Sequence, residues 1–161
     1  MNHSVVYNRR KEKDNIPNYA IGYVYSNQLK KLVVPDSLPQ KKYVTYMDGI
    51  TGDDGVSSNL IDMNIWMKAS RNNSLLNSES IRLMTTPHIL SNGVKTNYGF
   101  GFFIRKGVGI EDVIYHTGSW PGYSTATIEL IESNVRIIIL TNRDYDELTF
   151  LADEIIFNII N

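Results

Sequence analysis

The sequence predicts an α+β fold in which helices precede an antiparallel sheet and a last helix packs on that sheet. Residues 57–97 carry start and stop signals of helices, and residues 98–142 have the two-residue period of strands. Residues 143–161 return to a helical period. The 161 residues are 42% hydrophobic and 20% charged, which is typical of one globular domain.

Residues 1–56 are expected to form an irregular lead-in that contains one strand. Aromatic side chains alternate along Tyr19–Tyr25, and this pattern predicts a strand. The stretch 27–42 holds two prolines and several lysines, which predicts an exposed loop. Three glycines follow within 48–55, where Ile50 breaks the alternation of oxygen ligands that calcium requires, so we expect a turn there and no metal.

Two helices are predicted within residues 57–97. Asn59 is a candidate N-cap with Asp62 three residues later, an arrangement similar to a capping box. Apolar residues then recur at helical spacing, namely Leu60, Ile61, Met63, Ile65 and Met67, with Trp66 beside them. A second helix begins near Asn77 and must end before Pro87.

Residues 98–142 predict an antiparallel meander, because short links join consecutive strands. The expected strands are Tyr98–Ile104, Val113–Thr117, Tyr123–Ile131 and Val135–Thr141. Five of the six residues from 135 to 140 are apolar, so this last strand should be buried on both faces.

The terminal segment Tyr145–Ile160 predicts an amphipathic helix on the sheet. Its apolar stripe consists of Leu148, Leu151, Ile155 and Ile159.

The composition argues against several classes of function. The net charge is −1, with 16 Lys and Arg against 17 Asp and Glu, which does not favour nucleic acid as a partner. There is no Cys and there are only three His, so no metal site and no cofactor are expected. No apolar run reaches the length of a membrane span, and the first residues lack the form of a signal peptide.

The usual motifs of a nucleophile are missing from the sequence. Neither Gly-x-Ser-x-Gly nor Ser-x-x-Lys occurs, and the nearest serines, Ser26, Ser37 and Ser91, have a Lys four residues later instead of three. A Lys activates a Ser one helical turn away only when both side chains share a face. Tyr25-Ser26-Asn27 spells Tyr-x-Asn, but we interpret it as a strand end with a turn.

The segment Tyr115-His116-Thr117-Gly118-Ser119 carries the most information about function. A His-Thr-Gly triplet at a strand end resembles the third motif of the serine β-lactamase and penicillin-binding protein family. Further matches occur in order along most of the chain: Gly49-x-x-Gly52-Asp53-x-Gly55-x-x-Ser58, Leu83-Met84-x-x-Pro87, Tyr98-Gly99-x-Gly101-Phe102 and Ile139-Leu140-Thr141-Asn142. The resemblance implies a β-lactamase/transpeptidase-like fold. His in place of Lys resembles the class C-like branch of D-Ala-D-Ala carboxypeptidases, D-aminopeptidases and esterases, and argues against efficient hydrolysis of antibiotics.

The resemblance also implies roles for the residues of this segment. His116 would bind the substrate carboxylate or assist proton transfer, and Thr117 would hydrogen-bond the substrate. Gly118 would allow the substrate backbone to approach, and the backbone N–H of Ser119 would belong to an oxyanion hole. Trp120 and Tyr123 would wall the cleft, although each could equally be a packing residue.

The family's Ser-x-x-Lys and Tyr-x-Asn motifs precede every segment matched here, so we expect the nucleophile and the base to lie upstream of Met1 in a longer parent protein. The complete protein would acylate and hydrolyse a peptidoglycan-like peptide, a β-lactam or an ester in the periplasm or outside a bacterial cell. The isolated chain would be inactive. The alternative is a truncated, non-catalytic binding or interaction domain.

The expected partial domain comprises a lead-in (1–56), a helical segment (57–97), a meander (98–142) and a terminal helix (143–161). The family flanks the strand 135–141 with strands from the missing part. Apart from Arg136, this strand carries no residue that blunts an open edge, so self-association through it is expected.

Overall fold

The structure, a computed structural model, describes residues 1–6, 16–41, 52, 55–106, 111–145 and 147–160. Most of the glycine-rich loop 48–55 therefore lies outside the described residues.

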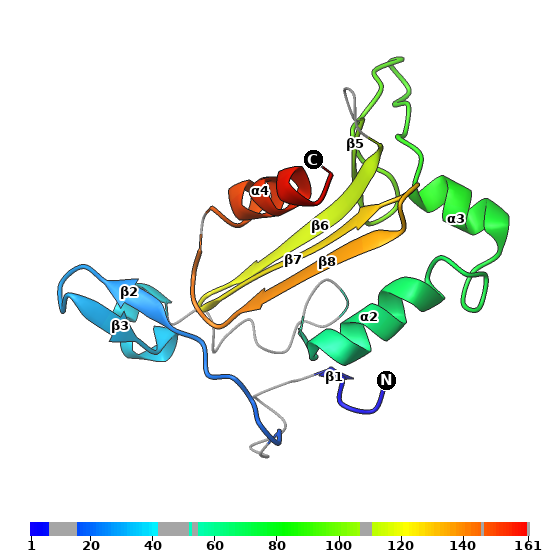
Figure 1. Ribbon diagram of the computed structural model, residues 1–161. Coiled ribbons are helices and arrows are strands. Elements are labelled where there is room, and N and C mark those ends of the chain that lie inside the picture. Colours follow the sequence, from blue (N-terminus) through cyan, green and yellow to red (C-terminus); the bar gives the residue numbers. More distant parts are fainter. Residues whose placement is uncertain (7–15, 42–51, 53–54, 107–110, 146, 161) are drawn as a thin grey trace.

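A four-stranded antiparallel sheet forms the centre of the fold, in the order β5-β6-β7-β8 (Figure 1). Its strands are β5 (Phe103–Arg105), β6 (Val113–Trp120), β7 (Tyr123–Leu130) and β8 (Val135–Thr141). The predicted meander and the α+β class are confirmed.

Helices lie on opposite sides of this sheet (Figure 1). The helix α4 (Leu148–Ile160) covers one side, and α2 (Leu60–Ala69) lies on the other side beside β8. The short helix α3 (Ser78–Met84) follows α2 along the chain.

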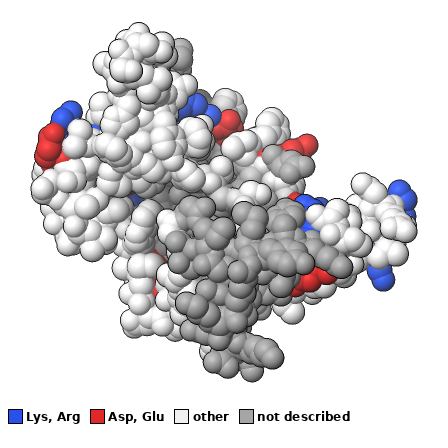
Figure 2. Space-filling model, turned by 180° about the vertical axis from the view of Figure 1, so that it is seen from behind, with Lys and Arg blue, Asp and Glu red and all other residues white. Residues whose placement is uncertain are grey.

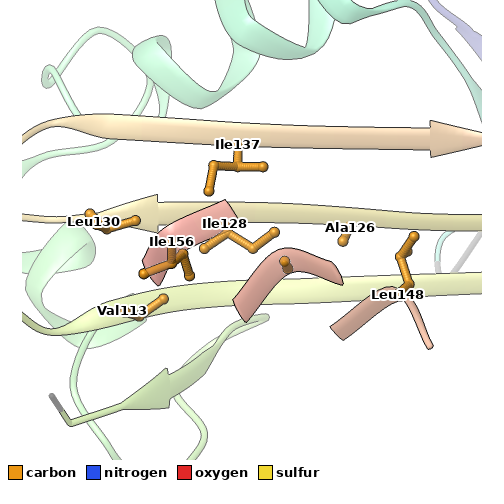
Figure 3. Packing of buried hydrophobic residues seen from close by; sticks show 8 residues of the cluster. Val113, Ala126, Ile128, Leu130, Ile137, Leu148 and Ile156 are labelled. Carbon is orange, nitrogen blue, oxygen red and sulfur yellow. The ribbon is translucent and has the colours of Figure 1, made fainter. Parts of the chain in front are cut away.

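The main core lies between the sheet and α4. Its buried members come from β6, β7, β8 and α4 and form one cluster (Figure 3): Val113, Ala126, Ile128, Leu130, Ile137, Leu148, Ala152 and Ile156. The buried stripe of α4 is Leu148, Ala152 and Ile156, a spacing of four residues. The predicted stripe is therefore wrong at Ile159, which is 50% exposed, because the helix begins at Leu148 and turns another row toward the sheet.

The prediction that β8 is buried on both faces is wrong. Among its residues only Ile137 is buried, and Leu140 is 38% exposed. The reason is position: β7 pairs with one edge of β8, and no strand of the described residues pairs with the other edge. The apolar sequence of β8 thus lies at the border of the sheet.

Two other strands differ from the sequence prediction. The strand expected over 98–104 is reduced to β5, because Gly101 adopts a φ of 82° and the chain folds back so that Gly99 N–H donates to Phe102 O. In contrast, β6 continues past Thr117 to Trp120, since β7 pairs with it along its whole length.

Residues 16–41 of the lead-in contain more regular structure than predicted. The strand expected over 19–25 is only β2 (Val24–Ser26), which forms a hairpin with β3 (Lys31–Val33) in the segment predicted to be a loop. Lys30 makes the tight turn of this hairpin with a φ of 51°. Two 3-10 helices, η1 (Pro35–Ser37) and η2 (Pro39–Lys41), follow.

The predicted cap at Asn59 and the predicted helix start at Asn77 are confirmed. The side chain of Asn59 accepts a hydrogen bond from the N–H of Asp62, and Asn77 accepts one from Ser80 in the same way. The capping box is incomplete, however, because the Asp62 carboxylate accepts from His3 N–H and from the Ser4 hydroxyl, both at 2.8 Å. Asp62 therefore holds the N-terminus against α2, beside the pair of β1 (Val5–Val6) and β4 (Val56–Ser57).

None of the helices described in the structure is long and apolar enough to cross a membrane.

Candidate functional site

The residues singled out in the sequence lie on β6 and at the start of β7. Residues 113–115 of β6 pair with β5, and the edge of β6 from His116 to Ser119 has no strand partner among the described residues. This open edge begins next to Phe103, the first residue of β5, which pairs with Tyr115. A strand edge of this kind offers backbone N–H and C=O groups to a ligand.

The side chains of this segment do not all share one surface, because neighbouring residues of a strand point to opposite faces. Thr117 lines a cavity of about 50 Å³ between β6 and α4, together with Ala126, Thr149 and Ala152. His116 is directed to the other face and takes no part in that cavity. The backbone groups of His116 and Thr117 thus lie on the same open edge of β6, whereas their side chains lie on opposite faces of the sheet.

His116 is held in an aromatic cluster. Its Nε2 lies 3.0 Å from the hydroxyl oxygen of Tyr98, and its ring is stacked on Phe103 with a centroid distance of 5.7 Å. Phe103 in turn packs edge-on against Tyr98 at 4.7 Å. The sequence prediction did not include Tyr98 or Phe103 as site residues, although Tyr98 belongs to the quoted segment Tyr98-Gly99-x-Gly101-Phe102.

Gly118 lies where a side chain would meet the neighbouring strand. A Cβ atom at this position would lie 2.6 Å from Oγ1 of Thr125, its cross-strand partner on β7. Close packing within the sheet is therefore one physical reason for glycine here. Gly118 and Ser119 are both exposed, which leaves their backbone accessible from solvent.

Tyr123 anchors the lead-in to the end of the sheet. Its hydroxyl accepts a hydrogen bond from Gly22 N–H and lies 2.8 Å from the carbonyl oxygen of Ala20. The ring fills the space in front of Gly22, where a Cβ atom would come within 2.5 Å of it. Of the two roles considered for Tyr123, the contacts in this structure are those of packing. Trp120, its cross-strand partner, is half-buried.

Tyr25 lies elsewhere in the fold. It pairs with Leu32 in the β2–β3 hairpin and is 53% exposed, and this hairpin lies beyond the end of the central sheet (Figure 1). The tyrosine that reaches His116 is Tyr98. The sequence pattern Tyr25-Ser26-Asn27 is a strand end followed by a turn, in which Ser26 Oγ accepts from Leu29 N–H.

No group of three or more potential metal ligands occurs among the residues that the structure describes. On the face shown in Figure 2, acidic and basic side chains form small separate groups among uncharged residues.

Comparisons with known proteins agree on one family. Residues 9–158 match the Beta-lactamase family. The chain is 36% identical over 146 residues to penicillin-binding protein 4* of Bacillus subtilis (strain 168), covering 91% of this chain and 32% of that protein. It therefore spans about a third of this curated relative's length.

Solved structures show the same fold. The octameric penicillin-binding protein homologue from Pyrococcus abyssi matches with a TM-score of 0.66 and 27% identity, over 88% of this chain and 30% of the other. A penicillin-binding protein from Bacillus halodurans matches with a TM-score of 0.61 and 19% identity, over 85% of this chain and 39% of the other. From the match to residues 9–158 and the curated relative, we conclude that this chain belongs to the Beta-lactamase family.

Proposed function

We propose that this chain supplies the strand edge and the His-Thr-Gly part of an acyl-transfer site in a serine hydrolase of the D-Ala-D-Ala carboxypeptidase or esterase type. The nucleophile and the base would come from a part of the protein outside these 161 residues, because the sequence contains no Ser-x-x-Lys. The observation that carries the proposal is the open edge of β6 from His116 to Ser119.

The substrate would lie along this edge as an extended segment. Its backbone would pair with β6, and Gly118 would permit the close approach. His116 would bind the substrate carboxylate or assist proton transfer. The Ser119 N–H would stabilise the tetrahedral oxyanion, a contribution of about 3 kcal/mol for one donor of this kind.

Thr117 would act by a different route in this geometry. Its side chain lines the cavity on the α4 side, while its backbone belongs to the open edge. A hydrogen bond from the Thr117 hydroxyl to substrate would require the substrate to reach over the edge of the sheet. A backbone contact would require no such displacement.

Two measurements on the purified chain test this proposal. Incubation with penicillin followed by intact-mass spectrometry should show no covalent adduct, and a stoichiometric mass increase would reveal a nucleophile in this chain. Titration with a peptide ending in D-Ala-D-Ala should shift the backbone amide resonances of residues 116–119. The same peptide ending in L-Ala-L-Ala is the control, and equal shifts with both peptides, or shifts confined to other residues, would contradict the proposed site.

The second candidate is a non-catalytic interaction domain that associates with copies of itself through β8. Its support is the apolar edge strand Val135–Thr141, whose outer edge has no strand partner within the described part of the chain. The relative from Pyrococcus abyssi is described as octameric. Chromatography with light scattering distinguishes a monomer of 18.3 kDa from an oligomer.

A further inference from the structure

A hydrogen bond joins the side chain of Tyr98, in the segment before β5, to that of His116, at the start of the open edge of β6. The Tyr98 hydroxyl oxygen and the His116 Nε2 are 3.0 Å apart, with an angle of 62° between the ring planes. Both side chains are half-buried, and Phe103 packs against each of them. The contact is thus part of a packed cluster of three rings.

The backbone of Tyr98 is held by contacts that do not involve His116. Tyr98 O accepts hydrogen bonds from His88 N–H at 3.1 Å and from the Thr96 hydroxyl at 3.0 Å. Tyr98 also forms an isolated bridge with Phe103. The phenol is therefore held in place by the segment 88–103 and not by His116 itself, as a positioning residue requires.

The direction of this hydrogen bond follows from the chemistry of the two groups. A phenol is a stronger donor than the N–H of a neutral imidazole, and an imidazole nitrogen is a stronger acceptor than a phenol oxygen. The favoured pair therefore has the Tyr98 O–H donating to Nε2. In a neutral imidazole with Nε2 as acceptor, the proton must be on Nδ1.

We propose that Tyr98 is a positioning residue that holds neutral His116 in the Nδ1–H tautomer and fixes the direction in which its ring presents that N–H. Nδ1 has no hydrogen-bond partner among the described residues. The buried side-chain atoms without a partner there are Arg71 Nη1, His88 Nε2 and Arg136 Nε, so the unpartnered Nδ1 of His116 is not itself buried. The N–H of Nδ1 is thus available to an outside acceptor.

This tautomer would define what the neutral His116 ring can do. As a neutral donor, the ring would offer a hydrogen bond to a carboxylate or to a carbonyl oxygen of the substrate. It could not accept a proton at Nε2 without losing the hydrogen bond from Tyr98. This part of the inference rests on the proposed function, whereas the tautomer itself does not.

Nitrogen-15 NMR of the imidazole in the full 161-residue chain measures the tautomer without any substrate. At about pH 8.5, where an ordinary imidazole is neutral, His116 should be mainly Nδ1–H. In Tyr98→Phe, which removes only the hydroxyl, the ratio of Nδ1–H to Nε2–H should fall about fivefold, the equivalent of one hydrogen bond of about 1 kcal/mol.

Tyr115→Phe is the matched control, because Tyr115 also packs against Phe103, with a centroid distance of 5.2 Å. It should leave the His116 tautomer unchanged. Mainly Nε2–H in the unmodified chain, an unchanged ratio in Tyr98→Phe, or an equal fall in Tyr115→Phe would each overturn the inference. If Tyr98→Phe does not fold, the tautomer of the unmodified chain decides.

The result is separable from the proposed function. Loss of the Nδ1–H preference overturns the role of Tyr98, even where the D-Ala-D-Ala peptide still shifts residues 116–119. Absence of those peptide shifts together with the expected tautomer overturns the proposed function and leaves the role of Tyr98 in place.

Discussion

The Nε of Arg71 lies 2.8 Å from Oε2 of Glu129, and this contact ties the turn that follows α2 to the C-terminal end of β7. The other carboxylate oxygen of Glu129 lies 2.8 Å from the guanidinium of Arg136 on β8. The Arg71 side chain also covers the ring of Phe102 at 4.8 Å. One buried carboxylate thus joins the α2 side of the fold to two strands.

Glu129→Gln should destabilise the chain by about 3 kcal/mol, because it leaves two largely buried guanidinium groups without a counter-charge. Urea denaturation measures the free energy of unfolding. The control is Glu79→Gln, which breaks the exposed pair of Glu79 and Arg82 within α3 and should have little effect. Equal losses of unfolding free energy in both variants would show that the contacts of Glu129 with Arg71 and Arg136 stabilise the chain no more than an exposed ion pair does.

The contact of Asp62 with the N-terminus should make stability depend on pH. The pKa of Asp62 is lowered from its usual 3.8, chiefly by the hydrogen bond from His3 N–H and also by the Ser4 hydroxyl, although burial opposes this. A folded-state pKa below the unfolded value means that the stabilisation is present above about pH 3.8 and is lost as the pH falls through the folded-state pKa.

Urea denaturation of the unmodified chain and of Asp62→Asn between about pH 6 and about pH 2 tests this. The difference in free energy of unfolding should be largest at pH 6 and should shrink below about pH 3.8. Asn59→Ala removes the neighbouring cap and should cost about 1 kcal/mol at every pH. A difference for Asp62→Asn that is constant with pH would contradict the prediction.

Gly118→Ala should destabilise the sheet by about 1 to 3 kcal/mol, since the new Cβ would lie 2.6 Å from Thr125 Oγ1. Thr125→Ala removes that oxygen, so the double variant should regain most of the loss. Thermal denaturation of the four proteins measures this coupling. Additive losses would show that the two side chains do not interact.

The same double variant separates packing from binding at position 118. If Gly118 also permits the approach of a substrate backbone, the refolded double variant should still fail to show D-Ala-D-Ala-dependent shifts at residues 116–119. Normal shifts would assign Gly118 to packing alone.

Leu140→Lys should convert a self-associated chain into a monomer of 18.3 kDa, because a charged lysine on an edge strand disfavours pairing with another edge. Chromatography with light scattering measures the mass. Val94→Lys, at an exposed apolar residue away from β8, is the control and should leave the oligomer intact. If the unmodified chain is a monomer, this result contradicts association through β8.

The sequence alone determined the features that depend on neighbouring residues. The caps at Asn59 and Asn77 follow from side chains that bind backbone groups three residues ahead, and the strands β6, β7 and β8 follow from a two-residue period with short links. The family resemblance also rests on local strings such as His116-Thr117-Gly118, and the comparisons confirm it.

Only the tertiary structure decided the contacts between distant segments. Tyr98 meets His116 across 18 positions, and Arg71 meets Glu129 across 58, so no local period indicates either pair. The partly exposed faces of β8 were not predicted, for a related reason: apolar composition records that a strand can be buried, whereas burial itself depends on whether another segment lies against it. Side-chain direction on a strand is local, but the partner that each face meets is set by packing of the whole chain.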